Sequence, residues 1–166
     1  MIKMRKINPS QDCAELFKLT QEHNSYNLFP HQPQFINAEE FQNWITDRLF
    51  NYFHDLYVVE ELFDNGKSEI SGFLLAYDYR IYDSHCQICG YLRQGINSTI
   101  LKKFIDSLFK EYPLNKVFME VIDIDHFLIT AAREIGFIQE ATLYGVKFVL
   151  GEYRDLYIMG LYPQKR

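Results

Sequence analysis

The sequence predicts a mixed α/β fold of the α+β type, in which a mostly antiparallel central sheet of about six to seven strands is flanked by about four helices. Segments with the periodicity of strands and of helices alternate along the whole chain. The pair Asn65-Gly66 separates two strand-like segments, and such a pair is typical of a tight hairpin turn. The chain then ends in a strand, a helix and a long hairpin between Val117 and Leu161. Together these features predict one layered domain that spans residues 1–166.

The first half of the chain is expected to begin with an edge strand and two helices and to continue into a hairpin. Asp12 and Glu15 have the spacing of a capping box, in which side chains satisfy backbone N–H groups at a helix start. Asn37 holds a similar position before a second helical segment. The expected elements are a strand at 2–7, helices from Asp12 to about Gln21 and from Asn37 to about Tyr52, and strands at 56–61 and 69–80.

The second half is expected to contain two strands, two helices and the final hairpin. Apolar residues recur at helical spacing after Ser98 and form one face: Ile100, Leu101, Phe104, Ile105, Leu108 and Phe109. Pro113 ends this helical region, because proline cannot continue a helix. The expected elements are strands at 85–92 and 117–122, helices from Ser98 to Lys110 and over about ten residues up to Gly136-Phe137, and a hairpin with its turn at 150–153 and its second arm at 154–161.

The composition fits a single domain of ordinary size. The chain has 166 residues, of which 48% are apolar, so it can bury a core without disulfides or metal. Aromatic residues make up 16%, and some of these rings are expected to line a pocket or a subunit contact. A homodimer formed through the aromatic C-terminal hairpin is compatible with this composition.

The charge of the chain argues against some classes of partner. The formal net charge is −5, whereas surfaces that bind nucleic acid or anionic membranes gather Lys and Arg. An acidic protein instead favours a cationic amine as its substrate. The basic segment Met1–Ile7 has too few apolar residues for a signal peptide, and no apolar run approaches the ~18 residues of a membrane span. We therefore expect no nucleic acid, no membrane and a cytoplasmic location.

Three cysteines occur, at positions 13, 86 and 89, and the last two form a Cys-x-x-Cys pair. A zinc site would need two more ligands at matching spacing, and a redox pair would need a helix start that lowers the pKa of a thiol. Cys86 and Cys89 instead fall in a predicted strand, where residues three apart point to opposite faces. They are expected to be buried thiols, and no metal site is predicted.

The segment Arg93-Gln94-Gly95-Ile96-Asn97-Ser98 is a candidate anion site. A helix that begins just after a glycine turn directs unpaired N–H groups and the positive end of its dipole at whatever lies above it. Asn97, Ser98 or Thr99 can cap the helix and leave neighbouring N–H groups free. Such a turn suits a pyrophosphate.

The order of elements from this turn to the C-terminus resembles that of the GCN5-related N-acetyltransferase (GNAT) family. The final hairpin adds Gly151-Glu152-Tyr153-Arg154-Asp155 and Gly160-Leu161, an ending that looks most like the branch that acetylates ribosomal-protein N-termini and small amines. The resemblance covers about residues 56–162. It implies an enzyme that transfers an acetyl group from acetyl-CoA, its cosubstrate, to a primary amine by direct attack. The amine would be a small molecule or a protein or peptide N-terminus.

The resemblance also implies which residues meet acetyl-CoA. Strand residues Gly90, Tyr91 and Leu92 would bond the pantetheine amides, whereas the pyrophosphate would be held by the turn residues Arg93, Gln94, Gly95, Ile96, Asn97 and Ser98. Asp125 stands where the family often has Asn, and it would meet the pantetheine or a bridging water, or simply cap the helix. Other departures from the family pattern are Leu92 in place of Gln or Arg, Asn97 in place of Gly or Ala, and Ala132 in place of the usual tyrosine acid.

Two residues are candidates for the chemistry. Glu120 is predicted to be the catalytic base, because strand alternation places it with Phe118 and Ile122 on a face otherwise built for burial, where the pKa of a carboxylate rises. The alternative is a carboxylate at a strand edge that is paired with Lys or Arg. Tyr91 would lie near the thioester if it follows the cofactor strand, and otherwise it is one more packed ring.

The acceptor and the function each have an alternative. The polar and aromatic connection from His23 to Phe35 lies where the family receives its acceptor substrate, although a surface loop packed by its own rings fits this segment equally. Because of Leu92, Asn97 and Ala132, the alternative function is a catalytically inactive acyl-CoA-binding protein with a regulatory or interaction role. A longer acyl-CoA is an alternative to acetyl-CoA.

Overall fold

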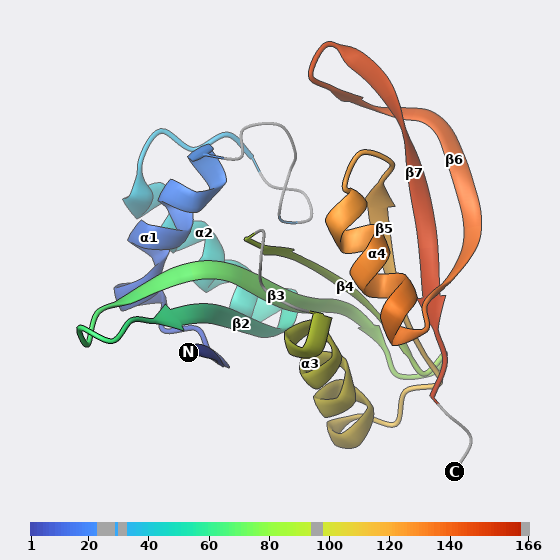
Figure 1. Ribbon diagram of the computed structural model, residues 1–166, viewed down its shortest axis with the longest axis horizontal. Coiled ribbons are helices and arrows are strands. Elements are labelled where there is room, and N and C mark those ends of the chain that lie inside the picture. The colour runs from blue at the N-terminus through green and yellow to red at the C-terminus, as the bar shows by residue number, and fades with distance from the viewer. Residues whose placement is uncertain (23–28, 30–32, 94–97, 164–166) are drawn as a thin grey trace. The chain divides into compact units, whose positions relative to one another are not determined.

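The computed structural model describes residues 1–22, 29, 33–93 and 98–163, which form seven strands and four helices (Figure 1). In chain order they are β1 (Ile2–Lys6), α1 (Pro9–Glu22), α2 (Ala38–Asn51), β2 (Phe53–Leu62), β3 (Ser68–Arg80), β4 (His85–Leu92), α3 (Ser98–Glu111), β5 (Lys116–Ile122), α4 (His126–Ile135), β6 (Ile138–Val149) and β7 (Glu152–Leu161). The predicted fold class and each expected helix and strand are confirmed, with shifts of a few residues at their ends.

The strands form one sheet in the order β1-β2-β3-β4-β5-β7-β6. The pairs β1–β2, β2–β3, β5–β7 and β6–β7 are antiparallel, whereas β4–β5 is parallel. The parallel register runs from His85 opposite Lys116 to Ile88 opposite Met119. A parallel pair needs a long crossover connection, and α3 lies in the connection from β4 to β5. The sheet is thus mostly antiparallel, as predicted.

Contacts within the chain divide it into two compact units. Unit 1 comprises residues 1–78 and 89–93, and unit 2 comprises residues 79–88 and 94–166. Helices α1 and α2 belong to unit 1, and α3 and α4 belong to unit 2. That the whole chain acts as one domain stays a prediction.

An apolar cluster from α1, α2, β2 and β3 forms the core of unit 1. Phe29 and Phe73 are fully buried, and their rings stack with centroids 4.1 Å apart. Phe41 of α2 meets the edge of the Phe29 ring at 5.9 Å. Because each buried ring removes a large apolar area from water, this cluster is a main source of stability in unit 1.

The start of α1 differs from the expectation. Pro9 begins the helix, and Asp12 lies in its first turn rather than before it. The carbonyl of Asn8 accepts the N–H groups of Gln11 and Asp12, and the Asp12 carboxylate accepts the Asn8 N–H at 2.6 Å. Proline suits the first helical position because it has no N–H group to satisfy there. The prediction of a capping box that opens at Asp12 is therefore wrong, since Asn8 and Pro9 already start the helix.

Arg5 ties the start of α1 to β1 and β2. Its guanidinium donates to both carboxylate oxygens of Asp12, at 2.7 and 2.8 Å, and its Nε donates to Glu60 at 2.9 Å. Burial opposes ionisation of Asp12, but the hydrogen bonds from Arg5 and Asn8 and the charge of Arg5 outweigh it, so the pKa of Asp12 lies below its ordinary value. The hydrogen bonds that Arg5 donates to Asp12 and Glu60 raise the pKa of its guanidinium.

Helices α3 and α4 supply buried apolar side chains to unit 2. The predicted apolar face of α3 is confirmed, with Phe109 half-buried at its margin and the other members buried. Helix α4 begins after its N-cap Asp125 and ends at Gly136, which has a φ of 112°. Glycine tolerates this conformation better than any other residue and is common just past a helix end.

The final hairpin joins β6 and β7 through the two residues Leu150 and Gly151, whose φ values are 53° and 83°. A two-residue turn with two positive φ values matches the twist of its strands. Glu152 and Tyr153 already belong to β7, so the predicted turn at 150–153 is two residues too long at its end. Figure 1 shows the hairpin tip beyond the end of β5, which pairs only with residues 156–161 of β7.

The cysteines are free thiols. Cys86 is buried as expected, whereas Cys89 is only half-buried against the apolar cluster of unit 1. Cys13 is buried, and burial together with the neighbouring charge of Asp12 raises the pKa of its thiol to about 12. Within the described ranges, no three His, Cys, Asp or Glu side chains are grouped so that they could hold a metal ion. No helix in the described part of the chain is both long and apolar enough to cross a membrane.

Candidate functional site

The predicted pantetheine strand is the C-terminal end of β4, which lies in unit 1. Gly90 packs directly against β3, since a Cβ atom on it would lie 2.6 Å from the carbonyl oxygen of Phe73. On β3, a Cβ atom on Gly72 would collide with the carbonyl oxygen of Tyr91. The two glycines therefore allow the backbones of β3 and β4 to approach each other more closely than side chains would permit. Packing within unit 1 requires Gly90 whether or not a cofactor binds there.

The side chains of Tyr91 and Leu92 pack toward the interior of unit 1. Tyr91 is half-buried and packs against its apolar cluster. Leu92 is 6% exposed. Burial accounts for an apolar residue at position 92, where the GNAT pattern has Gln or Arg. Any contact of Leu92 with a cofactor would have to come from its backbone.

Arg93 is engaged through both its backbone and its side chain. Its N–H donates to the carbonyl of Ser71 at 2.9 Å, and its Nη2 donates to Glu69 Oε1 at 2.8 Å. The hydrogen bond and the charge of Arg93 lower the pKa of Glu69. The backbone N–H of Arg93 is already hydrogen-bonded to β3, so the guanidinium is the group of Arg93 that can bind a phosphate. Glu69 would compete with the phosphate for this guanidinium.

The centre of the predicted phosphate turn, Gln94, Gly95, Ile96 and Asn97, lies outside the described residues, as do residues 23–28 and 30–32 of the predicted acceptor loop. Ser98 begins α3, and its hydroxyl donates to Glu134 Oε2 of α4 at 2.8 Å. A helix start favours negative charge, so the Glu134 carboxylate is placed where a phosphate would also be stabilised. Sequence reasoning missed Glu134, because a contact across 36 residues has no local signal.

Glu120 lies on the less buried face of β5, contrary to the expectation. The buried side chains of this strand are Val117, Met119 and Val121, whereas Glu120 is exposed. Apolar residues lie on both alternating faces of β5, so the periodicity of the sequence could not show which face is buried. The exposed face is the one that carries the charged Glu120. The Glu120 side chain forms no hydrogen bond or ion pair with any described residue, so the alternative of pairing with Lys or Arg is not observed either.

Asp125 caps α4, because its carboxylate accepts the N–H of Leu128 at 3.0 Å. Burial raises the pKa of this carboxyl, although the Leu128 N–H and the charge of His126 act against the shift. Ala132 is fully buried in the same helix, at the position of the usual tyrosine acid. Capping is thus the observed role of Asp125, and α4 has no phenol at position 132.

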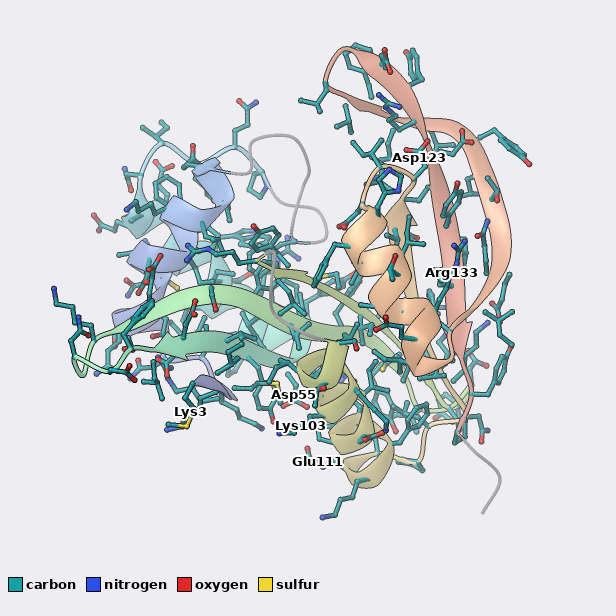
Figure 2. All side chains as sticks on the ribbon, viewed as in Figure 1. Lys3, Asp55, Lys103, Glu111, Asp123 and Arg133 are labelled. Carbon is teal, nitrogen blue, oxygen red and sulfur yellow. The ribbon has the colours of Figure 1, made fainter. Side chains whose placement is uncertain are left out.

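Asp123 is a polar residue that the sequence analysis overlooked, and it is labelled in Figure 2. It follows the end of β5, and its N–H donates to the carbonyl of Asp155 at 3.0 Å. Its Oδ1 is buried without a hydrogen-bond partner among the described residues. Asp123 and Asp125 thus place two carboxylates in the short connection from β5 to α4.

Taken unit by unit, the described residues include several groups that acyl transfer uses. Unit 2 has an exposed carboxylate at Glu120 and a helix start at Ser98. Unit 1 has the end of β4, with backbone amides and a guanidinium. A carboxylate can take a proton, and a helix start or a guanidinium can stabilise a phosphate.

The element order, the mostly antiparallel seven-stranded sheet and the parallel β4–β5 pair joined through α3 are those of the GNAT fold. The resemblance inferred from the sequence is confirmed at the level of the fold. No family model matches the chain, and no curated protein matches it either.

Several solved structures that resemble the chain are acetyltransferases. Spermidine N-acetyltransferase from Vibrio cholerae, in a dodecameric structure, has 16% sequence identity and a TM-score of 0.79, with 97% of this chain and 93% of that chain covered. The same enzyme in complex with CoA and spermine has 17% identity and a TM-score of 0.79, over 97% of this chain and 95% of that chain. Ribosomal-protein-S5-alanine acetyltransferase from Vibrio fischeri has 16% identity and a TM-score of 0.73, over 97% and 92%.

Proposed function

We propose that the protein is an N-acetyltransferase that moves an acetyl group from acetyl-CoA to a primary amine, on a small molecule or a protein N-terminus. One observation carries the proposal: 97% of the chain shares its fold with amine acetyltransferases, one of them in complex with CoA and spermine. The net charge of −5 supports a cationic amine rather than a nucleic acid or an anionic membrane. At 16–17% sequence identity, the shared fold supports the class of reaction, and experiments must identify the particular amine.

In the proposed reaction the amine nitrogen attacks the thioester carbonyl carbon, and the carbon–sulfur bond breaks. Glu120 takes the proton that the amine loses, directly or through water, since its carboxylate is exposed and has no partner among the described residues. Because position 132 is a buried alanine, we assign to Tyr91 the proton that converts the leaving thiolate into the thiol of CoA.

The cofactor would be held mainly by backbone groups. We propose that amides of Gly90, Tyr91 and Leu92 bond the pantetheine and that the turn 94–97 and Ser98 bind the pyrophosphate, with help from the Arg93 guanidinium. Asp125 would reach the pantetheine only through water, because its carboxylate already caps α4. A phosphate at the start of α3 would displace Glu134 from Ser98. Glu134→Gln is therefore expected to tighten CoA binding by about two- to fivefold.

Calorimetry with acetyl-CoA and thiol-release assays over a panel of amines test the proposal. We expect binding, and turnover with at least one primary amine. Glu120→Gln should lower kcat by about 100-fold and leave KM for acetyl-CoA unchanged, because a general base acts in the transition state. Glu111→Gln, an exposed carboxylate at the end of α3, is the control and should keep wild-type kinetics. No heat and no thermal shift at about millimolar acetyl-CoA would refute the proposal.

A second candidate function is a catalytically inactive acyl-CoA-binding protein with a regulatory or interaction role. The specific observation in its favour is Ala132, a buried methyl group in place of the tyrosine acid. Acetyl-CoA binding without thiol release over the whole amine panel would support this candidate. Co-purified CoA species, identified by mass spectrometry, would show whether a longer acyl chain is carried instead.

We further propose that residues 1–166 act as one cytoplasmic domain. The alignment with two acetyltransferase structures covers 93% and 92% of their chains, which supports a single domain. Three free cysteines suit the reducing environment of the cytoplasm. One of the similar acetyltransferase structures is dodecameric, which supports self-association of this chain as well.

A further inference from the structure

The side chain of Arg48 on α2 is held between two aromatic rings. Its Cζ atom lies 5.7 Å from the centroid of the Trp44 ring and 5.5 Å from that of the Tyr52 ring. Trp44, Arg48 and Tyr52 are spaced four residues apart along α2 and its C-cap, so they follow one face of the helix. A cation at such distances is attracted by the faces of both rings. The helix itself therefore holds the guanidinium in place.

The apolar cluster of unit 1 fixes both rings in turn. Trp44 and Tyr52 are half-buried against this cluster. The centroid of the Trp44 ring lies 5.3 Å from that of Phe35 and 5.8 Å from that of Phe53. The Tyr52 ring lies 6.0 Å from the Phe53 ring. Because these rings are packed in advance, a ligand that binds Arg48 would lose little affinity to the ordering of side chains.

The guanidinium of Arg48 has no acidic partner in the described part of the chain. No described residue forms a hydrogen bond or an ion pair with it, although the chain has 22 acidic and 17 basic residues. Its Nε is buried without a hydrogen-bond partner among these residues. The side chain as a whole is half-buried, so a small ligand can still reach its exposed part. A partly buried charge with unpaired donors costs free energy that an anionic ligand would recover.

The position of Arg48 in the last turn of α2 accounts for its charge but not for its unpaired donors. A cation near a helix C-terminus is stabilised by the helix dipole. Lysine would serve the dipole equally well. A planar guanidinium that is stacked on rings instead presents several N–H groups in a fixed fork, which can bind an oxyanion at two points.

The surroundings of Arg48 favour a carboxylate over a phosphate. Arg48 is the only basic residue of α2, and the neighbouring Asp47 is exposed and negative. One guanidinium can balance a monoanion, whereas a phosphate carries more charge and usually meets several N–H groups or cations. The half-buried rings of Trp44 and Tyr52 suit an apolar group next to the carboxylate.

We propose that Arg48, held between Trp44 and Tyr52, binds the carboxylate of a small organic molecule that also carries an apolar group. The carboxylate belongs either to the acceptor amine, which is then an amino acid or a related compound, or to a separate effector. Both sources present the same chemistry to the guanidinium. One charged pair with a partly exposed ring contact gives an expected dissociation constant of about 1 mM. The site lies entirely in unit 1 and can be tested without the proposed acetyl transfer.

The fluorescence of Trp44 reports on the site directly, because the chain has a single tryptophan. Hydrocinnamate, an aromatic carboxylate without an amine, should change the emission of the wild type in a saturable way at about millimolar concentration. Its methyl ester and inorganic phosphate should bind at least about tenfold more weakly. Arg48→Gln should weaken hydrocinnamate binding by about tenfold or more, and Arg48→Lys, which keeps the charge without the fork, should weaken it less. Arg133→Gln, at an exposed arginine of α4, is the control and should bind as the wild type does.

Acetylation kinetics distinguish the two sources of the carboxylate. Phenylalanine and phenethylamine are the same amine with and without a carboxylate. If the acceptor carries the carboxylate, Arg48→Gln should raise KM for phenylalanine about tenfold and leave kcat and the KM for phenethylamine unchanged. If an effector carries it, hydrocinnamate should change the rate of the wild type with phenethylamine without competing against that amine, and Arg48→Gln should abolish this change.

The binding arm decides the proposal even if no amine is acetylated, since an absence of turnover would count against the proposed function alone. The comparison of hydrocinnamate with its methyl ester uses the wild type, so it also holds if an Arg48 variant folds poorly. The proposal is overturned by a wild type whose emission shows no saturable change, by a methyl ester or phosphate that binds as tightly, or by a folded Arg48→Gln variant with undiminished affinity.

Discussion

Strands β3 and β6 have similar lengths and both carry many apolar residues, yet one is buried and the other is exposed. In β3 the side chains from Ile70 to Tyr77 are all buried, whereas in β6 only Val149 is. β3 has a strand on either side, and β6 is the last strand in the sheet order. Apolar content alone therefore does not determine burial, because the place of a strand in the sheet also does.

The difference separates two uses of apolar side chains. In β3 they form a core with α1 and α2, which stabilises unit 1 by removing area from water. On the tip of the β6–β7 hairpin they remain in water, where they contribute little to the stability of a single chain and are available to a partner. Substitutions in matched pairs, one from each region, can test this contrast.

The largest expected effect is that of Phe73→Ala compared with Phe148→Ala. Phe73 is fully buried and stacks on Phe29, so its loss should lower the free energy of unfolding by about 3–5 kcal/mol. Phe148 is 65% exposed, and its loss should change the free energy of unfolding by no more than about 0.5 kcal/mol in dilute solution. Urea unfolding at low protein concentration measures both.

The same pair also tests self-association of the chain through its C-terminal hairpin. At concentrations where the copies associate, Phe148→Ala should become more destabilising, because the dimer stabilises only the folded state. The effect of Phe73→Ala should be independent of concentration. Equal effects of the two changes in dilute solution would contradict the contrast between the regions.

The next effect is that of Gly90→Ala compared with Gly160→Ala. A methyl group at position 90 would meet the backbone carbonyl of Phe73, which cannot move away, so we expect a loss of about 1–3 kcal/mol. At position 160 it would meet the ends of the Glu140 and Lys116 side chains, which form a partly exposed ion pair. These ends can shift, and the loss should stay near ~1 kcal/mol or below.

Thermal unfolding ranks the two glycine variants directly. Gly90→Ala should in addition impair acetyl-CoA binding if β4 holds the pantetheine, whereas Gly160→Ala should not. A Gly160→Ala variant that is less stable than Gly90→Ala would show that the contact with the Lys116–Glu140 pair matters more than the close contact of β3 with β4.

Much of the fold was predictable because its signals are local. The bounds of β4 and the start of α3 were predicted as observed, since strand alternation and the turn before Ser98 mark them within a few residues. Gly136 marked the end of α4 for the same reason. The start of α1 was missed because two local signals compete there, and the one at Asn8 and Pro9 prevails.

The candidate site was less predictable because its features depend on distant residues. The close approach of Gly72 and Gly90, the pair of Ser98 with Glu134 and the pair of Arg93 with Glu69 join positions far apart in the chain. A single sequence has no pattern for such contacts. The outward face of Glu120 was missed because, over residues 117–122, both faces of the strand are apolar apart from that residue.

An effect of similar size is expected for Asp12→Asn in unit 1. The pKa of Asp12 is lowered, so its contribution to stability is present above its ordinary pKa of 3.8 and is lost as the pH falls through the lower folded value. Asn cannot receive the charged hydrogen bonds of Arg5 equally well, and we expect a loss of about 1–3 kcal/mol near neutral pH. Urea unfolding at a series of pH values should show the variant approaching the wild type below about pH 4. A gap that does not depend on pH would refute this account.

The smallest effect concerns Asp125 in unit 2, whose pKa shift has the opposite sign. Burial raises the pKa of Asp125, so its contribution to stability is complete below its ordinary value of 3.8 and is lost as the pH rises through the folded value. Asp125→Asn keeps an oxygen that can accept the Leu128 N–H and removes the charge that burial disfavours. We expect a gain at neutral pH that is smaller than the ~1 kcal/mol lost in Asp125→Ala, which removes the cap. The gain should grow as the pH rises, whereas a loss in Asp125→Asn equal to that in Asp125→Ala would show that the charge at the start of α4 is worth more than the cost of burying it.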